Sequence, residues 1–193
     1  MSVNPDDPRV RRTRQLLQNA LTDLMGEMSF NQISVQDITT RAGVNRATFY
    51  AHFEDKYALV NYHVRHMFLE ALQQRMPAKH EFSQATMRLF IVATAEFLRS
   101  FFGRCTPLDQ LSYPQMAIQV QVVLYEMFLA CQTQGHFPTA TLSKSPETTA
   151  TALSWLVFGA TFDWAHGGLK TSVDELADGL LPYMTVGLHG AGV

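Results

Sequence analysis

The chain has 193 residues, enough for one domain or for one small module joined to a medium one. Hydrophobic residues make up 47% of it and charged residues 17%, which excludes an intrinsically disordered chain and a low-complexity fibre. With 15 Lys and Arg against 17 Asp and Glu, the net charge of −2 gives no whole-chain argument for nucleic acid, so a basic surface must be local.

The cellular setting is predicted from what the sequence does not contain. Cys105 and Cys131 are too few for a disulfide scaffold, which favours a reducing compartment. The polar start, Met1 to Pro8, has no apolar segment of the kind found in signal peptides. No run of 18 apolar residues exists, because Asp163 interrupts the most apolar stretch. We expect a cytoplasmic protein without a membrane span.

The N-terminal part of the sequence predicts two helices. A first helix is predicted over residues 9–28, where apolar residues recur at spacings of four, three and four: Leu17, Leu21, Leu24 and Met28. Ser34 and Asp37 have the spacing of a capping box, in which each side chain meets the other's backbone N–H. They predict a short second helix ending near Ala42.

A tight turn and a third helix follow. Gly43 supplies the permissive backbone that a turn between two helices needs. Asn45 is placed to cap the third helix, and Phe49 and Phe53, four residues apart, lie on its inner face. Asp55 then predicts the start of a fourth helix.

The rest of the chain shows the same punctuation and almost no alternating strand pattern, so we predict an all-α fold. The expected helices are 56–76 ended by Pro77, 83–102, 112–134 ended by Gly135, one from Ser145-Pro146-Glu147 to Gly167-Gly168, and one from the Ser172–Glu175 capping box to about Val186. Pro182 predicts a kink or an early end in the last helix. For residues 106–111 a short helix and a turn both remain open.

Three short helices with a glycine turn before the third match the helix-turn-helix plan, in which the third helix enters the major groove of DNA. Its outward positions hold hydrogen-bond donors that suit base edges and phosphates: Arg46, Thr48, Tyr50 and His52. Four arginines between residues 9 and 14 are placed to lie over phosphates. We predict a DNA-binding domain over residues 1–56 and a larger helical domain over 57–193.

These residues resemble the TetR family of transcriptional regulators. The similar stretch runs through ITTRAGV at residues 38–44, NRATFYAHF at 45–53 and EDK at 54–56, and covers about Arg9 to Leu59. The resemblance implies a homodimer that binds a palindromic operator and is released by a small molecule.

The resemblance also assigns individual residues. It places the Tyr50 hydroxyl on a phosphate, and Arg46 and Thr48 on groove and phosphate at the start of the recognition helix. Lys56 matches the family lysine that opens the fourth helix, while Ala51 stands where the family often has a larger side chain. The predicted DNA-binding residues are Gln36, Asn45, Arg46, Thr48, Tyr50, His52 and Lys56. Thr39 and Thr40 either add to this surface or face the other way. For His52 a core-edge histidine satisfied by a backbone carbonyl is the alternative.

A dimer is predicted from the helix that begins at Ser145. Its large apolar residues cover nearly its whole circumference, so it needs cover on two sides, and a partner subunit supplies one of them. The last helix would complete a four-helix bundle. The predicted interface residues are Trp155, Phe158, Phe162, Leu176, Leu180 and Met184. A monomer in which this helix is central and fully buried is the alternative.

The apolar side chains also predict a ligand pocket. The chain has 13 Phe, 9 Met and 2 Trp, and such residues commonly line apolar cavities. The expected lining is Phe97, Phe101, Tyr125 and Trp155, for which plain core packing is the alternative. The expected effector is a small, largely apolar molecule.

The predicted function is therefore a ligand-responsive, DNA-binding repressor and not an enzyme. No cofactor motif is present, and His63 and His66 have no third metal ligand at an evident spacing, so we predict no metal site. Two alternatives remain. One is a helical protein-interaction module whose helix-turn-helix no longer binds DNA. The other is a small helical enzyme that uses His63, His66 or carboxylates in a pocket, among them Glu96, Glu126 and Asp163.

Overall fold

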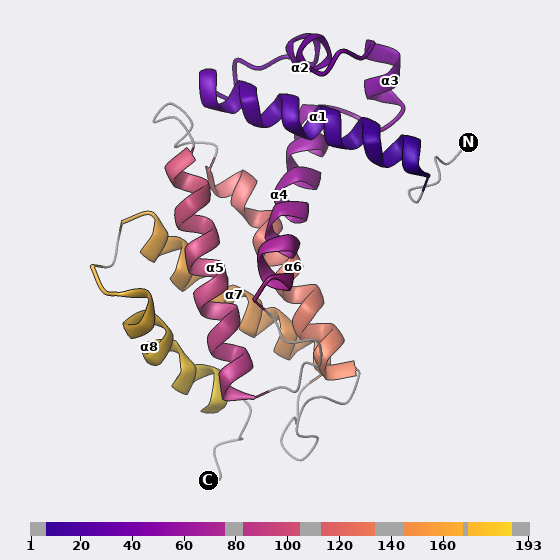
Figure 1. Ribbon diagram of the computed structural model, residues 1–193. Coiled ribbons are helices and arrows are strands. Elements are labelled where there is room, and N and C mark those ends of the chain that lie inside the picture. The colour runs from indigo at the N-terminus through magenta and orange to yellow at the C-terminus, as the bar shows by residue number, and fades with distance from the viewer. Residues whose placement is uncertain (1–6, 76–82, 105–112, 134–144, 168–169, 187–193) are drawn as a thin grey trace. The chain divides into compact units, whose positions relative to one another are not determined.

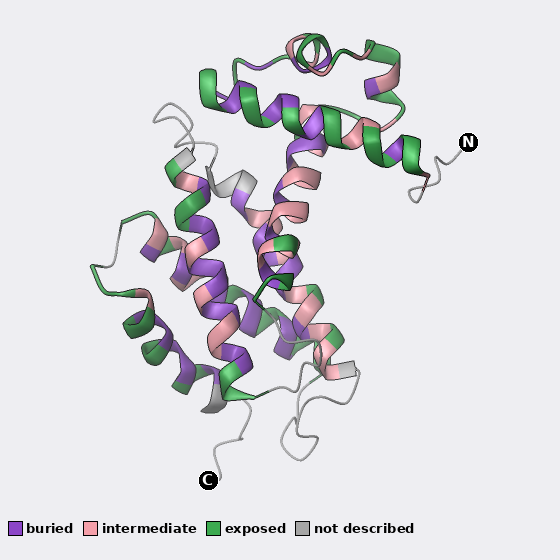
Figure 2. Cartoon of the chain, in the orientation of Figure 1, coloured by how far each residue is buried: buried purple, intermediate pink, exposed green. Residues whose placement is uncertain are grey.

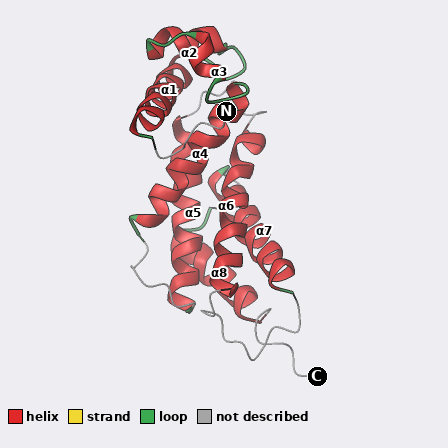
Figure 3. Cartoon of the chain, turned by 90° about the vertical axis from the view of Figure 1, so that its right-hand side faces the viewer, coloured by secondary structure: helices red, strands yellow, loops and turns green. Residues whose placement is uncertain are grey.

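The computed structural model describes residues 7–75, 83–104, 113–133, 145–167 and 170–186, which form helices and loops and include no strand (Figures 1 and 3). The helices are α1 (Pro8–Glu27), α2 (Val35–Ala42), α3 (Arg46–Tyr50), α4 (Lys56–Gln73), α5 (Gln84–Arg104), α6 (Tyr113–Thr133), α7 (Pro146–Ala165) and α8 (Val173–Val186). The all-α prediction is confirmed. In these ranges no helix has the length and apolar character needed to cross a membrane.

The chain divides into two compact units. The N-terminal unit comprises Met1–Val64 with Gly103–Met116, and the C-terminal unit comprises Arg65–Phe102 with Ala117–Val193. Helix α4 begins in the first unit and ends in the second. The expectations for Pro77, Cys105, residues 106–111, Gly135 and Gly168 lie outside the described residues.

Caps at the helix ends shape the N-terminal unit. The capping box is present, with Asp37 N donating to Ser34 Oγ over 3.2 Å and Ser34 N donating to Asp37 Oδ2 over 2.9 Å. Helix α2 ends at Gly43, which has φ 66°, a left-handed conformation that glycine adopts without strain. These features confirm the predicted bounds of the second helix and the turn after it.

The third helix is shorter than expected. It ends at Tyr50, and the N–H groups of His52 and Phe53 both donate to the carbonyl of Phe49, each over 2.9 Å, so residues 51–52 form a turn. The predicted inner face is confirmed, because Phe49 and Phe53 are buried. Burial of these two rings fixes which side of α3 faces outward.

Helix α4 begins as predicted, with Ala58 N donating to Asp55 Oδ1 over 2.7 Å. Its helical bounds end at Gln73, three residues before the expected end. Helix α8 runs to Val186, so Pro182 does not end it early. The predicted caps at Ser145 and Ser172 are both present.

Helix α5 holds the C-terminal unit together, since it contacts the part of α4 in this unit and also α6, α7 and α8. Three phenylalanine pairs have ring centroids 5.0, 5.0 and 5.3 Å apart: Phe68–Phe97, Phe90–Phe128 and Phe102–Phe162. Arg88 adds ion pairs to Asp174, at 2.7 Å, and to Asp178. The buried segments in Figure 2 run along the inner sides of these helices.

Candidate nucleic-acid interface

Helix α3 presents a short open surface, which we call the α3 face: Arg46, Ala47, Tyr50 and Ala51. All four residues are exposed, whereas Phe49 is fully buried and Thr48 is half-buried. Tyr50 keeps 49% of its surface exposed, which is high for a large aromatic residue. An exposed aromatic residue beside an arginine suits contact with a polyanion such as DNA.

Within the α3 face, Arg46 and Tyr50 contact each other. Arg46 Nη2 donates to Tyr50 Oη over 3.3 Å, and the guanidinium carbon lies 5.9 Å from the centre of the tyrosine ring. The two residues stand one helical turn apart, so the contact is local to α3. It holds the exposed arginine beside the exposed ring and uses one of the donors of its fork.

Two of the predicted DNA-binding residues, Asn45 and Thr48, are hydrogen-bonded to each other. Asn45 Oδ1 accepts from Thr48 N over 2.7 Å and from Thr48 Oγ1 over 2.9 Å, as a helix cap does. The hydroxyl hydrogen of Thr48 is therefore used within the protein. The structure brings Asn45 and Thr48 together to start α3, and their contact with DNA stays a prediction.

Gln36 lies on α2, whose exposed positions include Thr40. Gln36 Nε2 donates to Thr40 Oγ1 over 3.2 Å, and both residues are exposed. Thr39 is buried and donates its hydroxyl to the carbonyl of Gln36 over 3.1 Å. The two threonines therefore differ: Thr39 faces inward, away from the predicted DNA-binding surface, and Thr40 faces solvent.

His52 lies at the edge of the N-terminal core. It is half-buried, and its Nδ1 atom is buried without a hydrogen-bond partner, so no backbone carbonyl satisfies that atom. Burial, and then the positive charge of Arg14, lower the pKa of His52. The ring is therefore neutral near pH 7, where it offers DNA a dipole and no charge.

Lys56 has a role that the sequence analysis missed. Its Nζ donates to the carbonyls of Phe30, Asn31 and Ile33 over 2.9, 3.1 and 2.7 Å. An ammonium has three donors, and these three carbonyls take them all. Burial lowers the pKa of Lys56. The structure thus uses Lys56 to close the loop between α1 and α2, and its contact with DNA remains a prediction.

A salt bridge and a histidine also tie α1 to its neighbours. Arg41 on α2 donates to both carboxylate oxygens of Glu27, over 2.9 and 2.7 Å, and this hydrogen bonding lowers the pKa of Glu27. On α4, His63 Nε2 lies 3.1 Å from Thr22 Oγ1, and His63 Nδ1 lies 3.4 Å from Gln18 Nε2. Hydrophobic spacing carries no signal for such polar pairs, so the sequence analysis did not find them.

The other rival sites do not converge among the described residues. His63 faces α1, whereas His66 lies 3.6 Å from Glu70 on its own helix. Glu126 pairs with Arg65 at 2.5 Å. No group of three metal-ligating side chains occurs in the described part of the chain. Burial raises the pKa of the Cys131 thiol, which disfavours the reactive thiolate.

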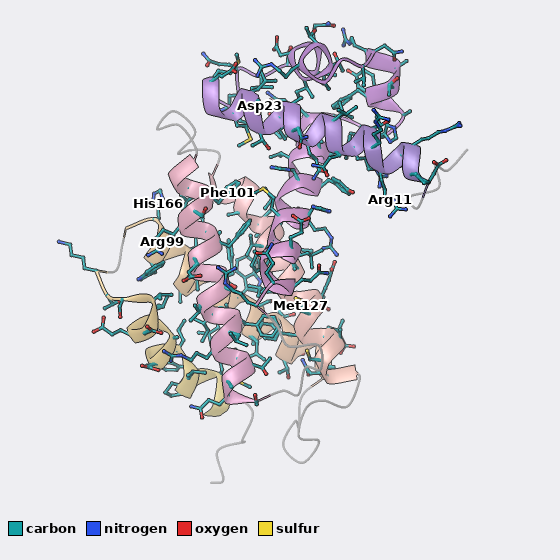
Figure 4. All side chains as sticks on the ribbon, in the orientation of Figure 1. Arg11, Asp23, Arg99, Phe101, Met127 and His166 are labelled. Atoms are coloured by element: carbon teal, nitrogen blue, oxygen red, sulfur yellow. The ribbon has the colours of Figure 1, made fainter. Side chains whose placement is uncertain are left out.

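The four residues expected to line an effector pocket lie in different environments. Phe97 and Phe101 are buried and stacked on α5, with ring centroids 6.1 Å apart. Tyr125 on α6 is half-buried, and Trp155 on α7 is 49% exposed. Figure 4 labels Phe101 and Arg99 on the C-terminal part of α5 and His166 just after α7. Phe97 and Phe101 suit an interior lining, and Trp155 does not.

The expected dimer residues divide in the same way. Phe158, Leu176, Leu180 and Met184 are all at most 9% exposed, and Met184 is 0% exposed, so it has no surface to offer a partner. Assigning Met184 to the interface is therefore wrong, because the stripe it shares with Leu176 and Leu180 packs into the core of its own unit. Trp155 and the half-buried Phe162 remain candidates.

Exposed residues of α7 and α8 add to these candidates. Tyr183 on α8 is 70% exposed, and the sequence analysis missed it because it lies outside the apolar stripe. Ala152 is exposed, and a Cβ added at Gly159 would meet nothing within 4 Å, so both positions leave room for a close neighbour. We use the name α7/α8 patch for these accessible positions of the two helices taken together: Ala152, Trp155, Phe162 and Tyr183.

Comparisons with known proteins agree with the helix-turn-helix geometry. Residues 18–62 match the family model described as bacterial regulatory proteins, tetR family. An uncharacterised HTH-type transcriptional regulator of Bacillus subtilis (strain 168), YxbF, is 42% identical over 55 residues, which is 28% of this chain and 14% of that protein. The matched part is therefore a small fraction of this relative.

Solved structures match over most of the chain. RolR in complex with resorcinol has a TM-score of 0.58 at 17% identity, over 90% of this chain and 87% of that one. FadR from Bacillus subtilis in complex with stearoyl-CoA has a TM-score of 0.54 at 14% identity, over 91% and 99%. A TetR transcriptional regulator from Streptococcus agalactiae 2603V has a TM-score of 0.54 at 19% identity, over 92% and 96%. These similarities concern the fold.

Proposed function

We propose that this chain, which belongs to the TetR family of bacterial regulatory proteins by its residues 18–62, is a DNA-binding transcriptional repressor that responds to a small molecule. The observation that carries the proposal is the α3 face. Arg46 and Tyr50 are exposed on it while Phe49 is buried behind them. A third helix with this arrangement is suited to the major groove, with residues 1–56 as the DNA-binding domain and 57–193 as the domain for effector and partner.

The proposed repressor is a homodimer on a palindromic operator. The α7/α8 patch supports this proposal, since it exposes two large aromatic residues, Trp155 and Tyr183, on helices that can form a four-helix bundle with a second copy. A two-fold dimer places two recognition helices about 34–36 Å apart, one turn of DNA. Because the proposed operator DNA lies in the cytoplasm, the proposed repressor acts there.

Substitutions in the α7/α8 patch test the dimer. Trp155→Asp and Tyr183→Asp place a charge on each exposed aromatic position, and sedimentation should then give the mass of one chain, 21.7 kDa, where the unmodified protein gives twice that mass. Asp163→Asn, an exposed polar position on α7, is the matched control. An unmodified protein that sediments as a single chain contradicts the homodimer.

The proposed effector is a small, largely apolar molecule that binds within the helices of the C-terminal unit. Phe97 and Phe101 support an apolar lining, and two proteins with this fold have been solved with resorcinol and with stearoyl-CoA. An effector releases the operator only as far as it prefers the conformation that does not bind DNA. No catalytic step is part of this proposal.

Selection of binding sites from random duplexes tests the function. A dimeric repressor should enrich an inverted repeat whose half-sites lie one helical turn apart. Its affinity should fall as salt rises, by about 0.9 in log K per log unit of salt for each phosphate neutralised. A protein-interaction module would enrich no sequence. Absence of any enriched site, together with a flat salt response, overturns the proposal.

A further inference from the structure

The α3 face limits which side chains can read bases. In residues 45–52, all of which the structure describes, Asn45 and Thr48 are bonded to each other and Phe49 is buried. His52 is half-buried. Asn45 is exposed, but its Oδ1 acceptor is used in the cap, so it cannot offer a base the paired acceptor and donor of a free amide. The other exposed side chains of this segment are one arginine, one tyrosine and two alanine methyl groups.

Arg46 is the member of this set with several hydrogen-bond donors. A guanidinium donates two parallel hydrogen bonds, and in the major groove the matching pair of acceptors is O6 and N7 of guanine. Tyr50 contacts the guanidinium over 3.3 Å through its hydroxyl and at 5.9 Å through its ring. That contact reduces the freedom of the arginine before DNA arrives, so less order has to be imposed on binding.

Ala47 and Ala51 supply the apolar part of the face. Both are exposed, and both follow a residue of the outward side, Arg46 or Tyr50. An alanine methyl group makes no hydrogen bond to a base and contacts the 5-methyl group of thymine favourably. Small side chains also let the backbone of α3 come close to the floor of the groove.

We propose that each half-site contains one guanine read by Arg46, with Tyr50 positioning the guanidinium, and thymine beside it read by the methyl groups of Ala47 and Ala51. This inference rests on the proposed function and names the sequence class that the α3 face accepts. One strong base contact and two weak ones define the half-site, and the remaining affinity comes from phosphates.

A specificity switch tests the assignment of Arg46. A glutamine amide donates to adenine N7 and accepts from adenine N6, so Arg46→Gln should change the selected base at one position of each half-site from guanine to adenine. Arg46→Ala should leave that position without preference. Lys170→Gln, an exposed charge in the C-terminal unit, is the matched control and should select the unmodified site.

Base analogues test the same contacts on the unmodified protein, so folding of a variant is not at issue. Replacing the guanine by 7-deazaguanine removes N7, one of the two acceptors, and should weaken binding about 2- to 13-fold, while the same replacement outside the half-sites has no effect. Replacing the adjacent thymines by deoxyuridine removes only the methyl groups and should weaken binding several-fold or less.

Each outcome separates this inference from the function it rests on. A selected inverted repeat that stays the same for Arg46→Gln, or that tolerates 7-deazaguanine at every position, overturns the inference and leaves the repressor in place. No selected site for the unmodified protein overturns both. A change confined to one base per half-site, with the analogue losses above, supports it.

Discussion

Both units have buried aromatic cores and capped helices, but the N-terminal unit includes the two short helices α2 and α3, and different contacts stand out in the two units. In the first, polar side chains bond to backbone groups at helix ends and loops, as Asn45 does at α3 and Lys56 does between α1 and α2. In the second, buried aromatic rings join long helices, as Phe90 and Phe128 do at 5.0 Å. Directional bonds fix the orientation of a small surface, whereas packed rings fill volume and tolerate rearrangement.

This difference suits the two proposed tasks. A face that reads bases has to be placed to within a fraction of an ångström, which hydrogen-bonded caps achieve. A unit that answers an effector needs two arrangements close in free energy, and an apolar interior rich in Phe and Met provides them more easily. The experiments below separate the two kinds of interaction.

The largest effects are expected from core truncation. Phe49→Ala and Phe128→Ala each remove a fully buried ring and should lower the free energy of unfolding by about 3–5 kcal/mol. Hydrogen exchange should increase most in the N-terminal unit for Phe49→Ala and in the C-terminal unit for Phe128→Ala. Equal loss of protection throughout the chain for both variants contradicts the division into two units.

Lys56→Met is expected to have the next largest effect. It keeps the length of the side chain and removes the ammonium that three carbonyls accept, so it should lower the free energy of unfolding by about 1–3 kcal/mol. Lys170→Met, at an exposed position, should leave it unchanged. A variant with unaltered stability and weaker DNA binding would instead assign Lys56 to a phosphate.

Asn45→Ala removes the cap of α3 and should cost about 1 kcal/mol. Asn45→Ser should restore most of this, since serine also accepts from the N–H two or three residues ahead. Chemical denaturation measures the stability and a gel shift measures binding. If serine restores stability and binding together, Asn45 acts through the helix; if only stability returns, the amide also contacts DNA.

The smallest expected effect is the pH dependence that His52 contributes. Burial and Arg14 lower its pKa in the folded state, so below the ordinary value of 6.5 the unfolded chain takes up a proton before the folded chain does. The contribution of His52 to the free energy of unfolding is therefore fully present above pH 6.5 and is lost as the pH falls towards its folded-state pKa. His52→Gln should flatten this slope between pH 7 and pH 5, and an unchanged slope would exclude His52 as its source.

Helix N-termini were the part of the fold that the sequence predicted best. Ser34, Asn45 and Ser172 each carry a cap whose residue type and spacing are sufficient evidence by themselves. The end of α4 was placed three residues too late, since Pro77 marks where a helix must stop and not where it does stop.

Roles that depend on contacts between distant segments were harder to predict. Met184 lies on a stripe that fits a core and an interface equally well, and only the packed structure shows that it faces the core. Lys56 reaches carbonyls more than twenty residues away, at Phe30 and Ile33, and spacing carries no information about such contacts. Among the α3 residues, Arg46 and Tyr50 were expected to face outward, and they do.

The most direct test of the account is a gel shift on the selected duplex with the unmodified protein, Arg46→Ala, Tyr50→Ala and Lys170→Ala. We expect Arg46→Ala to weaken binding about 5- to 150-fold, Tyr50→Ala to weaken it measurably, and Lys170→Ala to leave it within about twofold, all three with the sedimentation mass of the unmodified protein. Equal affinities for all four proteins would contradict the claim that the α3 face binds DNA.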